Sequence, residues 1–193
     1  PVVVDSKIGT YILDADELEA AISEKTKAII CVHAVGNPVD MPRVMEIATR
    51  HDLIVLEDNC DGFGGSIGKQ KLGSFGDISF TSFHAAHIVA MGQGGGIFTN
   101  HEELARRVKM YRDWGRQSGI KSRRVNEGKW PNLPNDYDAR FIYEKIGYNL
   151  SPLELQAAMG RVQLRKTSKI KHLRQRNFSY LYKGLSQFPD LIL

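Results

Sequence analysis

Short apolar runs alternate with segments whose apolar residues recur at helical spacing along most of this chain. The runs have the length and the β-branched content of buried strands. Between them, residues such as Val44, Ile47 and Ala48 stand three or four positions apart, which is typical of an amphipathic helix. Because strand and helix alternate in this way, the pattern predicts an α/β domain with a mainly parallel sheet.

Turn and capping residues set the boundaries of the predicted elements. We expect strands at residues 1–5, 27–32, 53–56, 78–83 and 96–99. We expect helices at residues 17–23, 41–51, 101–114, 153–164 and 168–185. Residues 63–75 are rich in glycine and predict a connection with a hairpin-like turn, and residues 115–143 lose all periodicity and predict a long loop.

Polar residues in front of three helices are expected to cap them, because a short side chain there can accept a hydrogen bond from a free backbone N–H. Asp14 or Asp16 precedes the first helix, and Asn100 precedes the third. Ser151 precedes the fourth helix, and Glu154 stands three residues later, which is the spacing of a capping box.

The composition narrows the classes of protein and partner. The net charge is +4, and residues 161–176 hold seven Lys or Arg side chains and no acid. Apolar residues at helical spacing in that segment favour a solvated helix face or a subunit contact over a nucleic-acid arm. No run approaches the roughly 20 apolar residues of a membrane helix. The two cysteines, Cys31 and Cys60, favour a reducing compartment, so we expect a cytoplasmic protein.

Several predicted strands end in polar residues that can carry chemistry. His33, Asp58 and Ser82 each stand at the end of one strand. We expect them to converge, because the carboxyl ends of parallel strands share one edge of the sheet. A carboxylate there can pair with the pyridinium nitrogen of pyridoxal phosphate. Ser82 and the glycines at 92 and 94–96 can supply hydroxyl and N–H donors to a phosphate.

A set of short motifs resembles the DegT/DnrJ/EryC1/StrS sugar aminotransferase family over nearly the whole chain. The motifs are KAI at 27–29, Glu57-Asp58 after a strand, GSFGD at 73–77, SFH at 82–84, RDWGR at 112–116 and GYN at 147–149. The resemblance implies the type I aminotransferase fold, a three-layer αβα arrangement with a mainly parallel sheet. Residues 1–150 would form the central and later part of the large domain, and residues 151–193 the helices leading to a small domain. We therefore expect the chain to be an internal piece of a longer protein.

His87 stands where this family's pattern places the lysine that forms a Schiff base with the cofactor. The sequence contains no lysine between Lys71 and Lys109. A histidine cannot form that covalent bond. The replacement resembles the nucleotide-sugar 3-dehydratases, which hold the cofactor as pyridoxamine phosphate. Cys60 matches the first of four cysteines that bind an iron–sulfur cluster in one branch, but no cysteine follows Arg116, so we expect no cluster.

The resemblance also implies a role for each candidate residue. Four residues would bind the cofactor: Asp58 at the pyridinium nitrogen, Ser82 at the phosphate, Asp61, and Asn149 at the phosphate of the neighbouring subunit. His87 would be the general base, which suits an imidazole because its ordinary pKa is near neutral pH. His33 and His84 would line the substrate pocket. The protein would then be a homodimer with shared active sites.

The leading hypothesis is an enzyme that removes the C3 hydroxyl of a nucleotide-linked 4-keto-6-deoxyhexose in deoxysugar or lipopolysaccharide biosynthesis. A sugar aminotransferase of the same family and a non-catalytic relative are alternatives. A metal-dependent hydrolase is a further alternative, since His84, His87 and either Cys60 or His33 are residue types that bind zinc.

Overall fold

The structure is a computed structural model that describes residues 1–117, 130–188 and 190. The chain forms two compact units. Unit 1 comprises Pro1–Phe98 and Glu154–Leu193, and unit 2 comprises Thr99–Leu153. Each unit is described by itself below.

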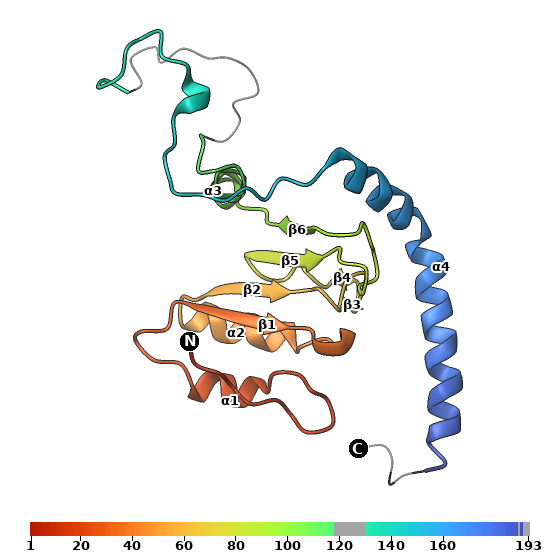
Figure 1. Cartoon of the computed structure of the whole chain (residues 1–193). Helices are drawn as coiled ribbons and strands as arrows, with labels where there is room; N and C mark the ends of the chain where they lie inside the picture. The colour runs from red at the N-terminus through yellow and green to blue at the C-terminus, as the bar shows by residue number, and fades with distance from the viewer. Residues whose placement is uncertain (118–129, 189, 191–193) are drawn as a thin grey trace. The chain divides into compact units, whose positions relative to one another are not determined.

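Unit 1 is built around a four-stranded sheet. Its strands are β1 (Ala28–Val32), β2 (Ile54–Asp58), β5 (Ile78–Ser82) and β6 (Gly95–Phe98), in the spatial order β1-β2-β5-β6. The β1–β2 and β2–β5 pairs are parallel, whereas β6 runs antiparallel to β5. Figure 1 shows these strands side by side. The mainly parallel sheet expected from the sequence is therefore confirmed, with an antiparallel strand at one edge.

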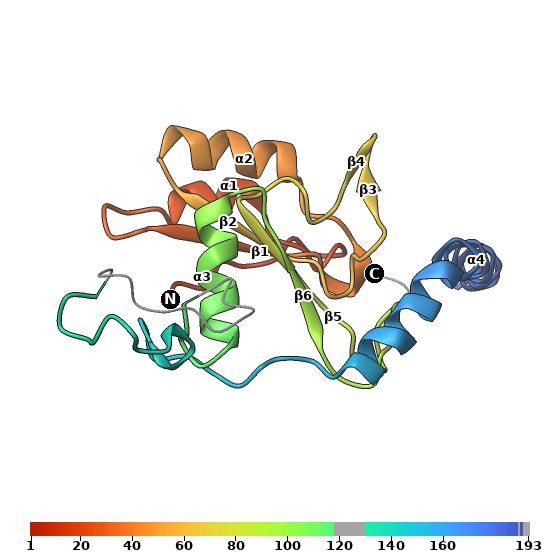
Figure 2. The ribbon, with the colours of Figure 1, turned by 90° about the horizontal axis from the view of Figure 1, so that it is seen from above.

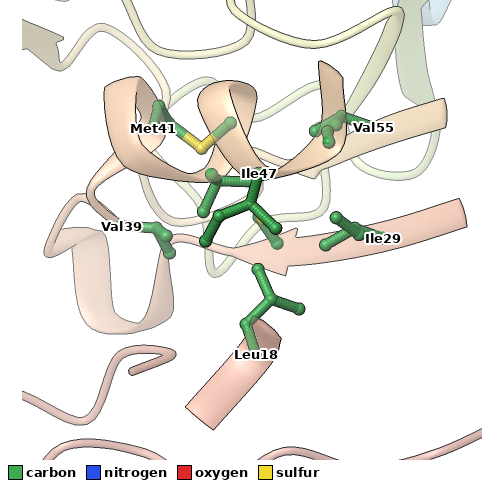
Figure 3. Close-up of a cluster of buried hydrophobic side chains, with 9 residues drawn as sticks. Leu18, Ile29, Val39, Met41, Ile47 and Val55 are labelled. Atoms are coloured by element: carbon green, nitrogen blue, oxygen red, sulfur yellow. The ribbon is translucent and has the colours of Figure 1, made fainter. Parts of the chain in front are cut away.

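Two helices cover one face of this sheet. These are α1 (Ala15–Ala20) and α2 (Met41–Arg50), and α2 lies along the strands in Figure 2. Asp14 caps α1 by accepting a hydrogen bond from the Asp16 N–H, as one of the two predicted alternatives. The core between the helices and the strands is the cluster shown in Figure 3, which consists of Leu18, Ile29, Cys31, Val39, Met41, Val44, Ile47, Ala48 and Val55.

The opposite sides of β1 and β2 are exposed. Along β1 and β2, buried and exposed side chains alternate, as they must where only one face of a strand is covered. Ile30, Val32 and Ile54 point to the open side, with 61%, 47% and 49% of their surface exposed. Of the three layers implied by the resemblance, the sheet and the layer formed by α1 and α2 are present in unit 1.

The remaining elements of unit 1 are a small hairpin, a short turn and a long helix. The hairpin is β3 (Ser66–Ile67) with β4 (Gln70–Lys71), and it confirms the predicted turn. A 3-10 turn, η1 (Ala34–Gly36), follows β1 directly. The helix α4 (Glu154–Leu185) contains 32 residues. In the described part of the chain, no helix is long and apolar enough to cross a bilayer.

Unit 2 contains the helix α3 (Glu102–Arg112) and a 3-10 turn, η2 (Ala139–Phe141). Asn100 was predicted to cap α3, but the residue at the cap is His101, and its side chain makes no capping hydrogen bond. Two acids in the first turn, Glu102 and Glu103, favour the helix start through the helix dipole. Part of the predicted loop at residues 115–143 lies outside the described residues.

Three predictions about these elements are wrong. Residues 1–5 form no strand; Val2 and Val3 are exposed, and a β-rich segment becomes a strand only beside a partner. The two helices predicted after residue 152 are one continuous helix, because residues 165–168 contain neither Gly nor Pro to interrupt it. The helix begins at Glu154, so Ser151 does not occupy its N-cap and the predicted capping box is not formed.

Ile47 is fully buried between α2 and the sheet, so its truncation tests the core. We expect Ile47→Ala to lower the free energy of unfolding by about 2–5 kcal/mol, because it removes buried methyl groups and leaves a cavity. The measurement is urea-induced unfolding followed by circular dichroism. Thr49→Ala, at an exposed position of the same helix, should change stability by no more than about 0.5 kcal/mol. Equal losses in the two variants would contradict the assigned core.

Candidate active site

Glu57 is fully buried near the end of β2, and its carboxylate organises the residues around it. Its Oε1 accepts hydrogen bonds from the backbone N–H groups of Phe75 and Gly76, both at 2.7 Å. Its Oε2 accepts a third from the N–H of Gly73 at 2.8 Å, and His33 Nε2 lies 3.2 Å away. Glu57 thus ties the GSFGD segment to the sheet, and Asp77 adds a second contact by accepting a hydrogen bond from the Val55 N–H at 2.8 Å.

His33 is also fully buried, and both of its ring nitrogens have partners. Nδ1 accepts a hydrogen bond from the Val39 N–H at 3.2 Å, so the ring hydrogen is on Nε2 and is donated to Glu57. No part of this ring is open to solvent. The predicted contact between His33 and a substrate stays a prediction, whereas the geometry supports a positioning role for this residue.

The pKa of Glu57 reflects two opposing effects. Burial raises it, but the hydrogen bonds from His33 and from the N–H groups of Gly76, Gly73 and Phe75 outweigh burial and hold it below its usual value of 4.5. At a pH between the folded-state and unfolded-state pKa values, Glu57 is therefore charged in the folded protein and protonated in the unfolded chain. Glu57 stabilises the fold fully above the unfolded-state value and loses that contribution as the pH falls through its lower folded-state pKa.

Asp58 and Ser82 lie at the carboxyl ends of two neighbouring strands, β2 and β5. The Asp58 Oδ1 accepts a hydrogen bond from the Cys60 N–H at 3.1 Å. The Ser82 Oγ accepts one from the His84 N–H at 3.2 Å, so its own hydrogen can be donated elsewhere. Both residues also interact with the Cys60 thiol, whose pKa is raised to about 11 by burial and by Asp58. The structure thus brings Asp58 and Ser82 to one edge, as expected from the sequence.

His84 and His87 follow β5 in a compact turn. The His87 N–H donates to the His84 carbonyl oxygen at 3.0 Å, and the two rings meet edge to face at 6.4 Å. The His84 Nδ1 accepts a hydrogen bond from the Ala86 N–H at 3.2 Å. His87 is partly exposed, and its Nδ1 lies 3.3 Å from the Asp61 Oδ1. Asp61 therefore contacts the residue that occupies the position of the family's lysine.

These side chains fit a phosphate-bearing pyridine ring that is held without a covalent bond. Asp58 would supply a carboxylate for a ring nitrogen, and Ser82 would supply a hydroxyl donor for a phosphate. His84 and His87 would supply imidazoles beside them, and no lysine lies between Lys71 and Lys109. In the described residues, no group of three His, Cys, Asp or Glu side chains is arranged to hold a metal. The alternative zinc site on His84, His87 and Cys60 or His33 is therefore not formed there.

Asn149 belongs to unit 2, where a short backbone ladder holds it opposite Asp113. The Tyr148 N–H donates to the Tyr111 carbonyl at 2.7 Å, and the Leu150 N–H donates to the Arg112 carbonyl at 3.0 Å. The Asn149 side chain is exposed. Its predicted contact with the cofactor phosphate of a neighbouring subunit stays a prediction.

Beside Asn149, Arg116 of the RDWGR motif lies close to two aromatic rings, an arrangement that the sequence did not indicate. The Arg116 guanidinium lies 4.8 Å from the Trp114 ring and 5.6 Å from the Tyr143 ring. Gly115 adopts φ +83° between them, and a Cβ there would overlap the Lys145 carbonyl. These cation–π contacts lie next to the backbone bridge between Asp113 and Asn149.

Sequence reasoning also missed the structural role of Glu57. It recorded Glu57 only as the neighbour of Asp58 in a motif. One signal was present, because successive strand residues point to opposite faces and Glu57 shares a face with the core residue Val55. A carboxylate on a buried face requires several hydrogen-bond donors, and the glycine-rich GSFGD segment offers free N–H groups.

Comparisons with known proteins identify the family of this chain. The model of the DegT/DnrJ/EryC1/StrS aminotransferase family matches residues 1–193. The chain is 39% identical over 199 residues to dTDP-4-dehydro-2,6-dideoxy-D-glucose 3-dehydratase of Saccharopolyspora spinosa, covering 100% of this chain and 43% of that one. It is 38% identical over 199 residues to the lipopolysaccharide biosynthesis protein RfbH of Salmonella typhimurium, covering 100% of this chain and 45% of that protein.

Solved structures show the same fold. The Escherichia coli GDP-4-keto-6-deoxy-D-mannose-3-dehydratase with bound hydrated PLP superposes with a TM-score of 0.84 at 28% identity. The match covers 96% of this chain and 47% of that one. The chain thus spans less than half the length of these relatives, and its fold is that of the PLP-dependent aminotransferases.

Replacing the Glu57 carboxylate by an amide tests its role as an acceptor. We expect Glu57→Gln to lower the free energy of unfolding by about 2–4 kcal/mol at neutral pH, because the new NH₂ group faces N–H donors. Glu24→Gln, an exposed acid in a turn, is the matched control and should leave stability nearly unchanged. Urea unfolding measures both. A neutral effect of Glu57→Gln would show that the carboxylate does not hold the GSFGD segment.

The same pair of proteins tests the lowered pKa of Glu57. The stability difference between the unchanged protein and Glu57→Gln should be constant from about pH 7 to about pH 5, and it should shrink as the pH falls below about 4.5. Urea titrations at successive pH values measure this difference. A difference that grows on acidification would mean that the carboxyl is protonated in the native state.

Proposed function

This chain belongs to the DegT/DnrJ/EryC1/StrS aminotransferase family, and from that premise we propose that it acts as a nucleotide-sugar 3-dehydratase. The substrate class is a nucleotide-linked 4-keto-6-deoxyhexose, from which the enzyme removes the C3 hydroxyl. The cofactor is pyridoxamine phosphate or pyridoxal phosphate. One observation carries the proposal: an imidazole paired with a carboxylate stands where a transaminase of this family needs its lysine.

The relatives support the reaction class but not one nucleotide. Two relatives are named as 3-dehydratases, one acting on a dTDP sugar and one on a GDP sugar. The name of a third refers to lipopolysaccharide biosynthesis, which supports deoxysugar formation as the setting.

Each site residue near the carboxyl ends of β2 and β5 has a defined role in the proposed reaction. When bound, the pyridine ring would act as the electron sink for loss of the C3 hydroxyl. Asp58 would pair with the ring nitrogen and keep it protonated, and Ser82 would donate its O–H to the phosphate. The imidazole of His87 would accept a proton from the cofactor's methylene carbon, since an imidazole can act as a general base. His84, whose ring meets that of His87 at 6.4 Å, would contact the sugar.

We further propose a homodimer in which Asn149 completes the neighbouring site, with no iron–sulfur cluster. A cluster on four thiolates requires four cysteines, whereas this sequence has two, and Cys31 is buried in the core. Both thiols are free, which supports a cytoplasmic location. Within such an enzyme, residues 1–150 would belong to the large domain and residues 151–193 would lead to the small domain.

A sugar aminotransferase is the second candidate, and His84 favours it. Histidine is common at this position in the aminotransferases that the chain resembles, where the dehydratases often carry tyrosine. The two reactions differ in product, because a dehydratase yields a deoxysugar and an aminotransferase yields an aminosugar.

The direct test supplies the intact protein with pyridoxamine phosphate and a nucleotide-linked 4-keto-6-deoxyhexose and follows the sugar by NMR. We expect loss of the C3 hydroxyl. His87→Asn should reduce turnover by about 10²–10⁴-fold and stop exchange of the cofactor's methylene proton with solvent. His172→Asn, on the exposed surface of α4, is the control and should retain full turnover. An aminosugar product would establish the second candidate, and an inert protein would establish a non-catalytic relative.

A further inference from the structure

We propose that Asp61 is a positioning residue that holds His87 in the tautomer with its hydrogen on Nδ1, so that Nε2 is free to accept a proton. The catalytic part of this inference rests on the proposed function, whereas the tautomer itself does not. In the sequence prediction Asp61 was a cofactor contact. The structure assigns its carboxylate to the base instead.

The contact itself sets the position of the ring hydrogen. The His87 Nδ1 lies 3.3 Å from the Asp61 Oδ1. A carboxylate accepts hydrogen bonds and does not donate them, so a carboxylate at this distance favours the form of the ring with a hydrogen on Nδ1. In a neutral imidazole the other nitrogen, Nε2, then carries a lone pair. Pairing of a histidine with an acid is a recurring way in which enzymes fix the tautomer and orientation of a base.

Asp61 is itself held by a strained turn at the end of β1. Its Oδ2 accepts a hydrogen bond from the Val35 N–H at 3.2 Å. Val35 has φ +50°, a left-handed conformation that is costly for a β-branched residue. Gly36 follows with φ +81°, and a Cβ there would lie 3.1 Å from the Asp61 carbonyl oxygen. Strain of this kind persists only where the surroundings enforce it, and it is concentrated at functional sites.

The main chain of His87 is held by a hydrogen bond within the turn that follows β5. Its N–H is bonded to the His84 carbonyl, so the turn presents the ring toward Asp61. His84 has the opposite tautomer, because its Nδ1 accepts a hydrogen bond from the Ala86 N–H. His33 is like His84, with Nδ1 as the acceptor. Of these three histidines, His87 alone is assigned a hydrogen on Nδ1 and no hydrogen on Nε2.

Asp58, the last residue of β2, and Asp61, three residues later, would then have separate roles. Asp58 is left to pair with the ring nitrogen of the cofactor, and Asp61 serves the base. Loss of Asp61 should therefore slow proton transfer while leaving the binding of the cofactor intact. Loss of Asp58 should weaken the binding and activation of the cofactor.

Histidine-selective ¹⁵N NMR of the intact protein tests the tautomer directly. Long-range ¹H–¹⁵N correlations distinguish a protonated from a bare ring nitrogen. We expect His87 to carry its hydrogen on Nδ1, and His33 and His84 to carry theirs on Nε2. In Asp61→Ala, the His87 pattern should move toward the Nε2–H form, whereas the His33 and His84 signals stay in place and report an intact fold.

Two variants accompany this measurement. Asp61→Glu keeps a carboxylate and should retain part of the Nδ1–H preference. Asp52→Asn, an exposed acid elsewhere in unit 1, should leave all three patterns unchanged. The proposal is overturned if His87 already carries its hydrogen on Nε2 in the unchanged protein. It is also overturned if the Nδ1–H form persists in Asp61→Ala.

Kinetics and cofactor binding separate positioning from direct contact. We expect Asp61→Ala to lower kcat by about 10- to 10³-fold with KM for the sugar nearly unchanged, and Asp61→Glu to recover part of the loss. The affinity for pyridoxamine phosphate, measured by absorbance titration, should stay the same. Weaker cofactor binding with unchanged tautomers would instead support a cofactor contact. If no variant has dehydratase activity but the tautomers are as assigned, the proposed function fails and the assignment of Asp61 stands.

Discussion

A carboxylate that leaves water loses several kcal/mol of hydration, so it must find strong hydrogen-bond donors inside the protein. Glu57 finds them in the backbone N–H groups of Gly73, Phe75 and Gly76 and in His33 Nε2. These contacts join the ends of β1 and β2 to the segment that leads into β5. The buried charge of Glu57 therefore helps to fix the carboxyl ends of the strands, where Asp58 and Ser82 lie.

The adjacent acids Glu57 and Asp58 have different roles because successive side chains of a strand point to opposite faces of the sheet. Glu57 points to the buried side of β2 and stabilises the fold, whereas Asp58 is only partly buried and is the residue proposed to pair with the cofactor. The same division recurs in two pairs of histidine and acid. His33 donates from Nε2 to Glu57 in the interior, and His87 approaches Asp61 through Nδ1 at the partly exposed edge. Histidine thus has two different settings here, one fully buried and one partly exposed, and each has a different acid as its neighbour.

The alternation of apolar runs and helical spacing was sufficient for the class of fold, since each strand and helix must bury one side. It was not sufficient for residues 1–5, which have strand-like composition but no neighbouring strand. It also failed for α4, where the two expected helices are one, because a stretch of good helix formers without Gly or Pro continues through the assumed break. Local composition does not show either cause. Residues 1–5 would need a neighbouring strand, and α4 depends on a helix that continues through residues 165–168.

The sequence by itself determined the order of elements from α1 to β2 and from β5 to α3, the polar residues at the strand ends, the family motifs, and the replacement of a lysine by His87. These are properties of residue type and spacing, which are visible without coordinates. Only the tertiary structure decided which donors surround Glu57, which partners the ring nitrogens of His33 and His84 have, and that Asp61 meets His87. The reason is that a tautomer or a buried charge is set by atoms within about 3 Å. Segments far apart along the chain supply those atoms, and only folding brings them together.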